Sequence, residues 1–164
     1  MTKWLNDREM QAWVRVASLL ELVPGVLETQ LKRDSGLSHF EYWVLAMLSE
    51  APERTLRMSS LASRTRGTLP RLSHVVSRLE KRGLVERFPD PSDARATNAR
   101  LTEAGWDVVV DAAPGHVTTV HESIIDALTP EQLDQLTAIG DAILERVAPD
   151  ALRVLAAQHV ETLP

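Results

Sequence analysis

Three side chains that can contact nucleic-acid bases recur along one stretch of the sequence. Arg71, His74 and Arg78 stand at positions i, i+3 and i+7, which places them on one face of a helix. Arginine can donate two hydrogen bonds to the O6 and N7 acceptors of guanine, and histidine can donate one to a base or a phosphate. The opposite face carries an apolar stripe made of Leu72, Val75, Val76 and Leu79. The pattern predicts a helix that packs by one side and reads a DNA groove with the other.

The start of this helix and the segment before it add groups suited to phosphate. Thr68 is the expected N-cap and Pro70 suits the first turn, where the free backbone N–H groups can hold an anion. Arg64 adds a positive charge just upstream. The interpretation of each side chain as a solvated surface group remains open, although the shared face favours DNA contact.

A second basic element is Asp93-Ala94-Arg95, at the tip of a predicted hairpin. An arginine at such a tip can enter the narrow, electronegative minor groove of DNA. Asp93 could hold the Arg95 guanidinium in place through charge-assisted hydrogen bonds. The alternative is an ordinary acidic turn with an incidental arginine.

Positive charge is concentrated around these two elements. Residues 54–100 contain eleven Lys and Arg against four Asp and Glu, a net charge of +7, whereas the other residues carry −12 and the whole chain −5. A basic block within an acidic chain is typical of a nucleic-acid footprint. The acidic remainder would repel DNA from the other surfaces.

The elements that must position these groups are mainly helical. We expect helices over 7–33, 38–50, 59–65, 68–82, 102–127, 129–147 and 151–160, and hairpin strands over 84–88 and 96–101, with 56–58 as a possible further strand. Ser38 with Glu41 forms a capping box, Ser59 or Ser60 caps the third helix, and Gly83 ends the fourth. Pro24 and Pro114 are expected to kink or interrupt their helices.

This order of elements predicts a mainly α fold with a small β-wing, a winged helix-turn-helix. We divide the chain into an N-terminal helix (1–35), the winged DNA-binding module (36–101) and C-terminal helices (102–164).

Four segments resemble the MarR (multiple antibiotic resistance regulator) family of bacterial transcription regulators: LASRT (61–65), LSHVVSRLEKRGLVER (72–87), DPSDAR (90–95) and LTEAG (101–105). The resemblance implies a homodimeric regulator, most often a repressor, with dimerisation helices in 1–35 and 102–164 that interlock with those of a second copy. Such a regulator binds palindromic double-stranded DNA and is released by a small aromatic ligand. Because residues 1–20 carry charges that a secretory signal would lack, we expect the protein to be cytoplasmic. It also places the family's wing motif on Asp93 and Arg95. Two departures are Pro70, where many members have a polar residue, and the absence of cysteine, which excludes thiol-based sensing.

A cluster of aromatic residues could line the ligand pocket that the resemblance implies. Aromatic walls with a few polar groups suit a small-molecule site. Arg57 could pair with a ligand carboxylate. The candidates are Trp13, His39, Tyr42, Trp43 and Arg57. Ordinary core and dimer packing remains the alternative for the aromatics.

Other functions find little support in the sequence. No nucleophile elbow, dinucleotide fingerprint or phosphate-binding loop occurs, so we expect no enzyme and no cofactor. His116 and His121 are five residues apart, which is not the i, i+4 spacing of a helical metal site, and no metal is expected. No uninterrupted apolar run reaches the roughly 18 residues of a membrane span. The competing hypothesis is a winged ligand-binding or protein-interaction module that does not bind DNA.

Overall fold

The computed structural model describes residues 1–150, and the helix expected over 151–160 lies outside them. The elements follow in the order α1 (Asp7–Ser35), α2 (His39–Ser49), η1 (Pro52–Arg54), β1 (Thr55–Arg57), α3 (Met58–Arg64), α4 (Leu69–Lys81), β2 (Val85–Asp90), β3 (Asp93–Leu101), α5 (Glu103–Ser123), η2 (Ile125–Ala127) and α6 (Pro130–Val147). The helices far outnumber the three short strands, so the prediction of a mainly α fold with a β-wing is confirmed.

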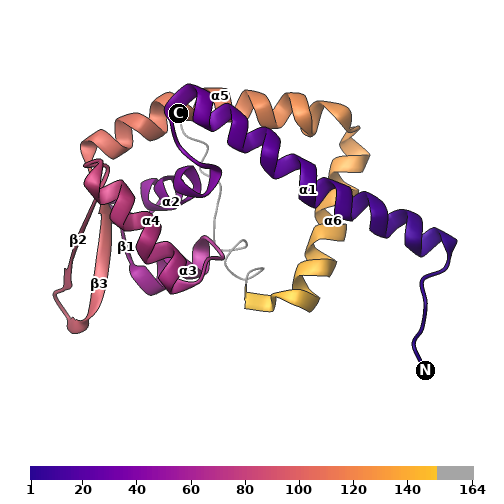
Figure 1. Ribbon diagram of the computed structural model, residues 1–164, viewed down its shortest axis with the longest axis horizontal. Coiled ribbons are helices and arrows are strands. Elements are labelled where there is room, and N and C mark those ends of the chain that lie inside the picture. The colour runs from indigo at the N-terminus through magenta and orange to yellow at the C-terminus, as the bar shows by residue number, and fades with distance from the viewer. Residues whose placement is uncertain (151–164) are drawn as a thin grey trace.

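A compact winged module sits at one end of two long helices (Figure 1). Helices α2, α3 and α4 pack against a three-stranded antiparallel sheet with the order β1-β3-β2. The hairpin of β2 and β3 extends beyond β1, which pairs only with residues 98–100. Helix α1 packs along α5, and α6 descends from the end of α5 that lies away from the winged module (Figure 1).

Local signals in the sequence fix most of the helix boundaries. Capping boxes start α1 at Asn6, α2 at Ser38 and α6 at Thr129, where each cap side chain and the acid or amide three residues later exchange hydrogen bonds with the backbone. The backbone of Gly83 has φ +73° after α4, a conformation that glycine adopts without the steric cost of a Cβ. Gly83 therefore turns the chain from α4 into the wing.

The structure differs from the expected boundaries in four places. Helix α1 is not interrupted at Pro24, nor α5 at Pro114, because a proline removes one helical hydrogen bond without preventing the turns on either side from forming. Helix α3 begins at Met58 with Arg57 as its N-cap, not at Ser59 or Ser60, because β1 runs directly into it. The wing strands are longer than expected and leave only Pro91 and Ser92 between them.

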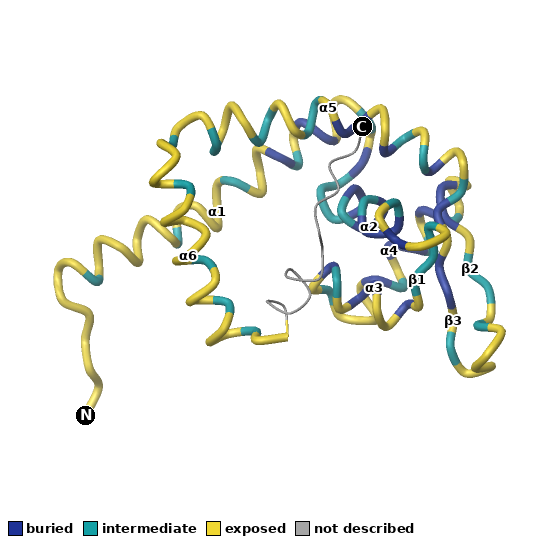
Figure 2. Tube along the Cα trace, turned by 180° about the vertical axis from the view of Figure 1, so that it is seen from behind, coloured by how far each residue is buried: buried dark blue, intermediate teal, exposed yellow. Residues whose placement is uncertain are grey.

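The core belongs to the winged module. Fully buried leucines and valines of α2 and α4 face α3, the sheet and the start of α5, and the apolar stripe of α4 is buried as predicted. In contrast, α1 has no buried residue before Leu27 and α6 has none at all (Figure 2). The long helices therefore expose apolar side chains that nothing within residues 1–150 covers.

One exposed helix is also long and apolar enough to cross a membrane. An 18-residue window of α1 has a mean hydropathy of 1.2 and none of it is buried, contrary to the expectation that no segment would reach this length. Length and composition alone are weak evidence, because a helix that packs against another protein passes the same test.

Gly105 provides a test of how α5 docks on the sheet. A Cβ at this position would clash with the carbonyl oxygen of Leu84 and lie 2.6 Å from Cδ1 of Leu101. We expect Gly105→Ala to lower the free energy of unfolding by about 1–3 kcal/mol in urea titrations, because backbone must move to admit the methyl group. Asp107→Ala, at an exposed site two residues on, should change it by no more than about 0.5 kcal/mol. Equal values for the two variants would contradict this close packing.

Candidate nucleic-acid interface

Helix α4 is held so that its outer face is free. The Oγ1 of Thr68 accepts a hydrogen bond from the backbone N of Arg71 at 3.4 Å, and Pro70 lies in the first turn, as the sequence predicts. Helical spacing places Pro70, His74, Ser77 and Lys81 opposite the buried stripe. Lys81 was not among the predicted DNA contacts, although it follows His74 by seven positions, the same spacing that relates Arg71 to Arg78.

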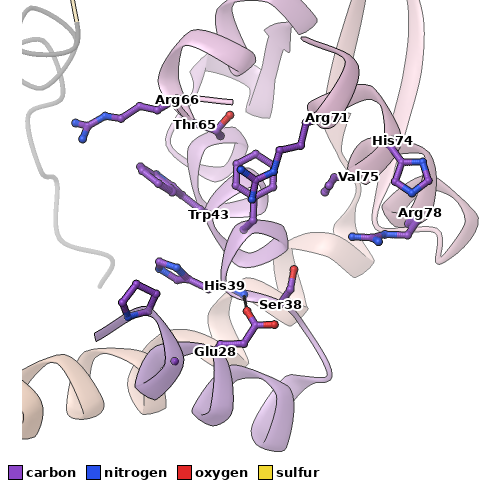
Figure 3. Close-up of a pocket in the computed structure, with 13 residues that line it drawn as sticks. Glu28, Ser38, His39, Trp43, Thr65, Arg66, Arg71, His74, Val75 and Arg78 are labelled. Carbon is purple, nitrogen blue, oxygen red and sulfur yellow. Dashed lines mark hydrogen bonds between the residues drawn. The ribbon is translucent and has the colours of Figure 1, made fainter. Parts of the chain in front are cut away.

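Arg71 and Arg78 lie at the side of α4 that adjoins α2. The Arg71 guanidinium carbon is 4.2 Å from the centroid of the Phe40 ring, and Nη2 of Arg78 is 3.2 Å from Oε1 of Glu41. His74 lies between them along the helix (Figure 3). Arg71, His74 and Arg78 therefore lie along one side of α4, as predicted. Arg71 and Arg78 are also in contact with residues of α2, although half of the Arg78 side chain remains exposed.

The other side of α4 is tied to the wing. Arg87 of β2 donates from Nη2 and Nε to Oε2 of Glu80, at 2.7 and 3.1 Å, and from Nη2 to Oγ of Ser77 at 3.0 Å. These contacts were not predicted, because they join residues seven and ten positions apart across a turn. They make the helix and the hairpin one unit.

The wing tip exposes Arg95, but Asp93 does not hold it in the predicted way. The Oδ1 of Asp93 accepts a hydrogen bond from the backbone N of Arg95 at 3.1 Å, so the carboxylate supports the main chain of the tip. Its Oδ2 is 3.9 Å from Nη1 of Arg57. The guanidinium beside Asp93 is thus that of Arg57.

Arg57 is therefore not a member of the aromatic cluster in which the sequence placed it. Its Nε donates to Oδ2 of Asp90 at 2.8 Å, at the wing. Arg64, at the end of α3, lies close enough to Glu50 at the end of α2 to counter part of the rise in the pKa of that carboxyl that burial causes.

Two pockets flank the aromatic residues of α2. The larger, of about 880 Å³, lies between α1, α2 and α4 and is lined by His39, Trp43 and the recognition-face residues Arg71, His74 and Arg78 (Figure 3). The smaller, of about 320 Å³, is lined by His39, Tyr42, Trp43, Ala46, Glu50 and His116. Trp13 lines neither, and 54% of its surface is exposed in the first half of α1.

The groups between the two pockets are uncharged at neutral pH. Burial lowers the pKa of His39, against a smaller opposing effect of the Glu28 carboxylate. Burial also lowers the pKa of His116, with a smaller contribution from the positive charge that His39 carries when it is protonated. Their ring centroids are 6.1 Å apart, and the Tyr42 ring is 4.6 Å from that of His116. Nδ1 of His116 and Oε1 of Gln30 are buried without a hydrogen-bond partner in the described part of the chain. Within residues 1–150, no three His, Asp or Glu side chains are placed to hold a metal ion.

Known proteins share both this sequence and this fold. The model of the MarR family matches residues 37–97. A MarR family regulator of Streptomyces coelicolor, Sco3205, solved in complex with DNA, is 41% identical, with a TM-score of 0.88 over 91% of this chain and 93% of its own.

Regulators from other bacteria are more distant relatives. MhqR of Bacillus subtilis (strain 168), an HTH-type transcriptional regulator, is 30% identical over 71% of this chain and 75% of its own length. The transcriptional repressor MprA of Escherichia coli (strain K12) is 24% identical over 72% of this chain, and the match spans 66% of the length of MprA. With its winged module, its wing motif and its similarity to Sco3205 over nearly the whole chain, this protein belongs to the MarR family of transcriptional regulators and is not an enzyme.

Proposed function

We propose that this regulator is a repressor that binds a palindromic operator as a homodimer and is released by a small aromatic anion. Residues 36–101 form the DNA-binding module, and the flanking segments 1–35 and 102–164 form the dimer. Operator binding places the protein in the cytoplasm. Repression is supported by the relative MprA, which is a transcriptional repressor.

The observation that carries DNA binding is the position of the basic groups around α4 and the wing. Arg71, His74 and Arg78 on α4 and Arg95 on the wing are exposed, with Thr68 and Pro70 at the start of α4. They belong to one module that the pair of Arg87 and Glu80 holds together. Helix α4 fits the major groove while the wing arginine enters the adjacent minor groove. The related Sco3205 was solved in complex with DNA, which supports the same role here.

The uncovered apolar helix faces support the homodimer. Helix α6 exposes Leu136, Ile139, Ile143 and Val147 at i, i+3, i+7 and i+11, which is one stripe. The first half of α1 also exposes Trp13, Leu20 and other large apolar side chains. A second copy supplies the missing cover for both helices, which also explains why α1 is apolar enough to resemble a membrane span.

The pocket between α1, α2 and α4 suits an aromatic anion. Phe40 and Trp43 supply ring faces, and the guanidinium groups of Arg66 and Arg71 lie over these two rings, at 5.9 Å from Trp43 and 4.2 Å from Phe40. A bound carboxylate would pair with these arginines. Because Arg71 belongs to α4, a ligand in this pocket touches the helix that reads DNA, which gives it a direct means of weakening DNA binding.

We expect Arg95→Ala to weaken binding of operator DNA about tenfold, because each wing loses its minor-groove cation. Operator DNA would be selected from a pool of random duplexes with the unaltered protein. The slope of log affinity against log salt should become shallower by about 1 for each wing, while the dimer persists in light scattering. Unchanged affinity and slope would exclude the wing as a DNA contact. Failure of the unaltered protein to bind any duplex at low salt would favour a winged module that does not bind DNA.

We expect Ile139→Glu to convert the dimer into monomers, because the new carboxylate would be buried in an apolar interface. Light scattering should report half the mass of the unaltered protein, and operator affinity should fall with it. Ala138→Glu adds the same charge to α6 at an exposed site off the stripe and should leave the dimer intact. A dimer of normal mass in the Ile139→Glu variant would show that α6 does not form the interface.

We expect aromatic carboxylates such as benzoate and hydroxycinnamates to displace the protein from operator DNA, and the matched neutral amides to be much weaker. Trp43→Ala should raise the concentration of acid required by about tenfold, because the anion's ring loses its stacking partner. DNA affinity without the acid should not change, and Trp4→Ala, outside the pocket, should behave as the unaltered protein. Equal potency of acids and amides would show that the arginines do not recognise the ligand.

A further inference from the structure

The tip of the wing lies beyond the support of the sheet. Strand β1 pairs only with Asn98, Ala99 and Arg100, so the hairpin from residue 90 to residue 97 has two strands alone. Residues 91–95 are all exposed, and the pairing register shifts between Pro89 and Asp90. A two-stranded hairpin without a packed face is marginally stable in water. The position of the tip must therefore be fixed by side chains.

Asp90 is the centre of the contacts at the tip. Its Oδ1 accepts hydrogen bonds from the backbone N and the Oγ of Ser92, at 2.8 and 2.6 Å, and its side chain is only 9% exposed. These bonds, together with the Arg57 guanidinium, hold the pKa of the Asp90 carboxyl well below its usual range. Asp90 is thus a carboxylate at physiological pH and closes the turn between β2 and β3.

Arg57 connects this turn to the body of the module. Arg57 ends β1 and is the N-cap of α3, so its backbone is fixed by two elements. Its guanidinium donates from Nε to Oδ2 of Asp90 at 2.8 Å and from Nη2 to Oγ of Ser92 at 3.2 Å. The pair joins residues 33 positions apart, so it ties the free end of the hairpin back to the start of the helix-turn-helix.

The same guanidinium reaches the residue that supports Arg95. Nη1 of Arg57 is 3.9 Å from Oδ2 of Asp93, whose Oδ1 accepts the hydrogen bond of the Arg95 backbone N at 3.1 Å. Arg57, Ser73 and Leu69 of the helix-turn-helix and Arg95 of the wing line one groove of about 410 Å³. The spacing between recognition helix and wing arginine is therefore set where Arg57 meets Asp90 and Asp93.

We propose that Asp90 and Arg57 are positioning residues for DNA binding, which hold the wing so that Arg95 reaches the minor groove while α4 occupies the major groove. The pair itself does not touch DNA. The inference rests on Arg95 being a DNA contact, as proposed above.

The sign of the expected effect separates positioning from simple electrostatics. Asp90→Asn removes a negative charge next to a DNA-binding surface, so electrostatics alone would strengthen DNA binding. If Asp90 instead holds the wing in position, its replacement would weaken DNA binding. Glu86→Gln is the matched control, because Glu86 lies on the same strand and pairs with an arginine, Arg100, at 2.6 Å, but at the base of the wing.

The test is a double-mutant cycle on the operator duplex selected by the unaltered protein. We expect Asp90→Asn to weaken binding about fivefold and Glu86→Gln to leave it unchanged or slightly stronger. Arg57→Gln should match Asp90→Asn, and the two together should be no worse than either. In the Arg95→Ala background Asp90→Asn should have no further effect, because the contact that it positions is gone. Thermal melts of each variant report any loss of the fold.

Each outcome decides the proposal. Unchanged or tighter binding of Asp90→Asn overturns it, as do effects of Asp90→Asn and Arg95→Ala that multiply, since Asp90 would then act independently of Arg95. A loss of affinity that follows a loss of thermal stability in all variants, Glu86→Gln included, assigns Asp90 a purely structural role. If Arg95→Ala alone has no effect, the wing contact of the proposed function fails and this inference fails with it. If Arg95→Ala weakens binding and the cycle shows no coupling, only the inference on Asp90 fails.

Discussion

The structure depends on how two ion pairs, one at each edge of helix α4, hold the helix while its apolar stripe is buried. Leu72, Val75, Val76 and Leu79 fix the depth and rotation of the helix in the core. Glu41 of α2 contacts Arg78 on one side, and Glu80 contacts Arg87 of β2 on the other. Partly exposed ion pairs of this kind add little stability each, and their effect here is geometric. A helix held by one face and both edges can offer only its remaining face to a DNA groove.

The clamp on the α2 side continues into the long helices. Glu28 of α1 accepts a hydrogen bond from the backbone N of His39 at 2.6 Å, at the first residue of α2. In the capping box of α2, Oε2 of Glu41 accepts from the backbone N of Ser38, while Oε1 of the same carboxylate faces Arg78. One end of α2 is thus bonded to α1 and to α4 within a few residues. A shift of α1 against α2 would move the end of α2 at which Glu41 contacts Arg78, so the ligand proposed for the larger pocket would act on the recognition face through this contact.

The sequence predicted what local rules govern. The stripe of α4, the caps Ser38 and Thr68 and the turn at Gly83 follow from residues within one or two helical turns, and all are confirmed. Failures occurred where distant segments decide. Arg57 was assigned to a ligand pocket because its partner, Asp90, lies 33 positions away on another strand. Trp13 was grouped with the α2 aromatics, but it lies in the first half of α1, well before Leu27, which is the first buried residue of that helix. Pro24 was expected to kink or interrupt α1, but the helix runs without a break from Asp7 to Ser35.

The structure also shows which of the positively charged side chains form ion pairs, which the sequence alone does not. Of the eleven Lys and Arg in residues 54–100, five form ion pairs in the described part of the chain, namely Arg54, Arg57, Arg78, Arg87 and Arg100. Their partners belong to α2, α4, α5 and the wing, so these pairs connect elements of the module. The other six are Arg64, Arg66, Arg71, Lys81, Arg82 and Arg95, and among residues 1–150 none has an ion-pair partner. Unpaired charges, unlike paired ones, gain a counter-charge when a phosphate arrives. The pairing pattern therefore divides one basic segment into cations that hold the winged module together and cations left for an anionic partner.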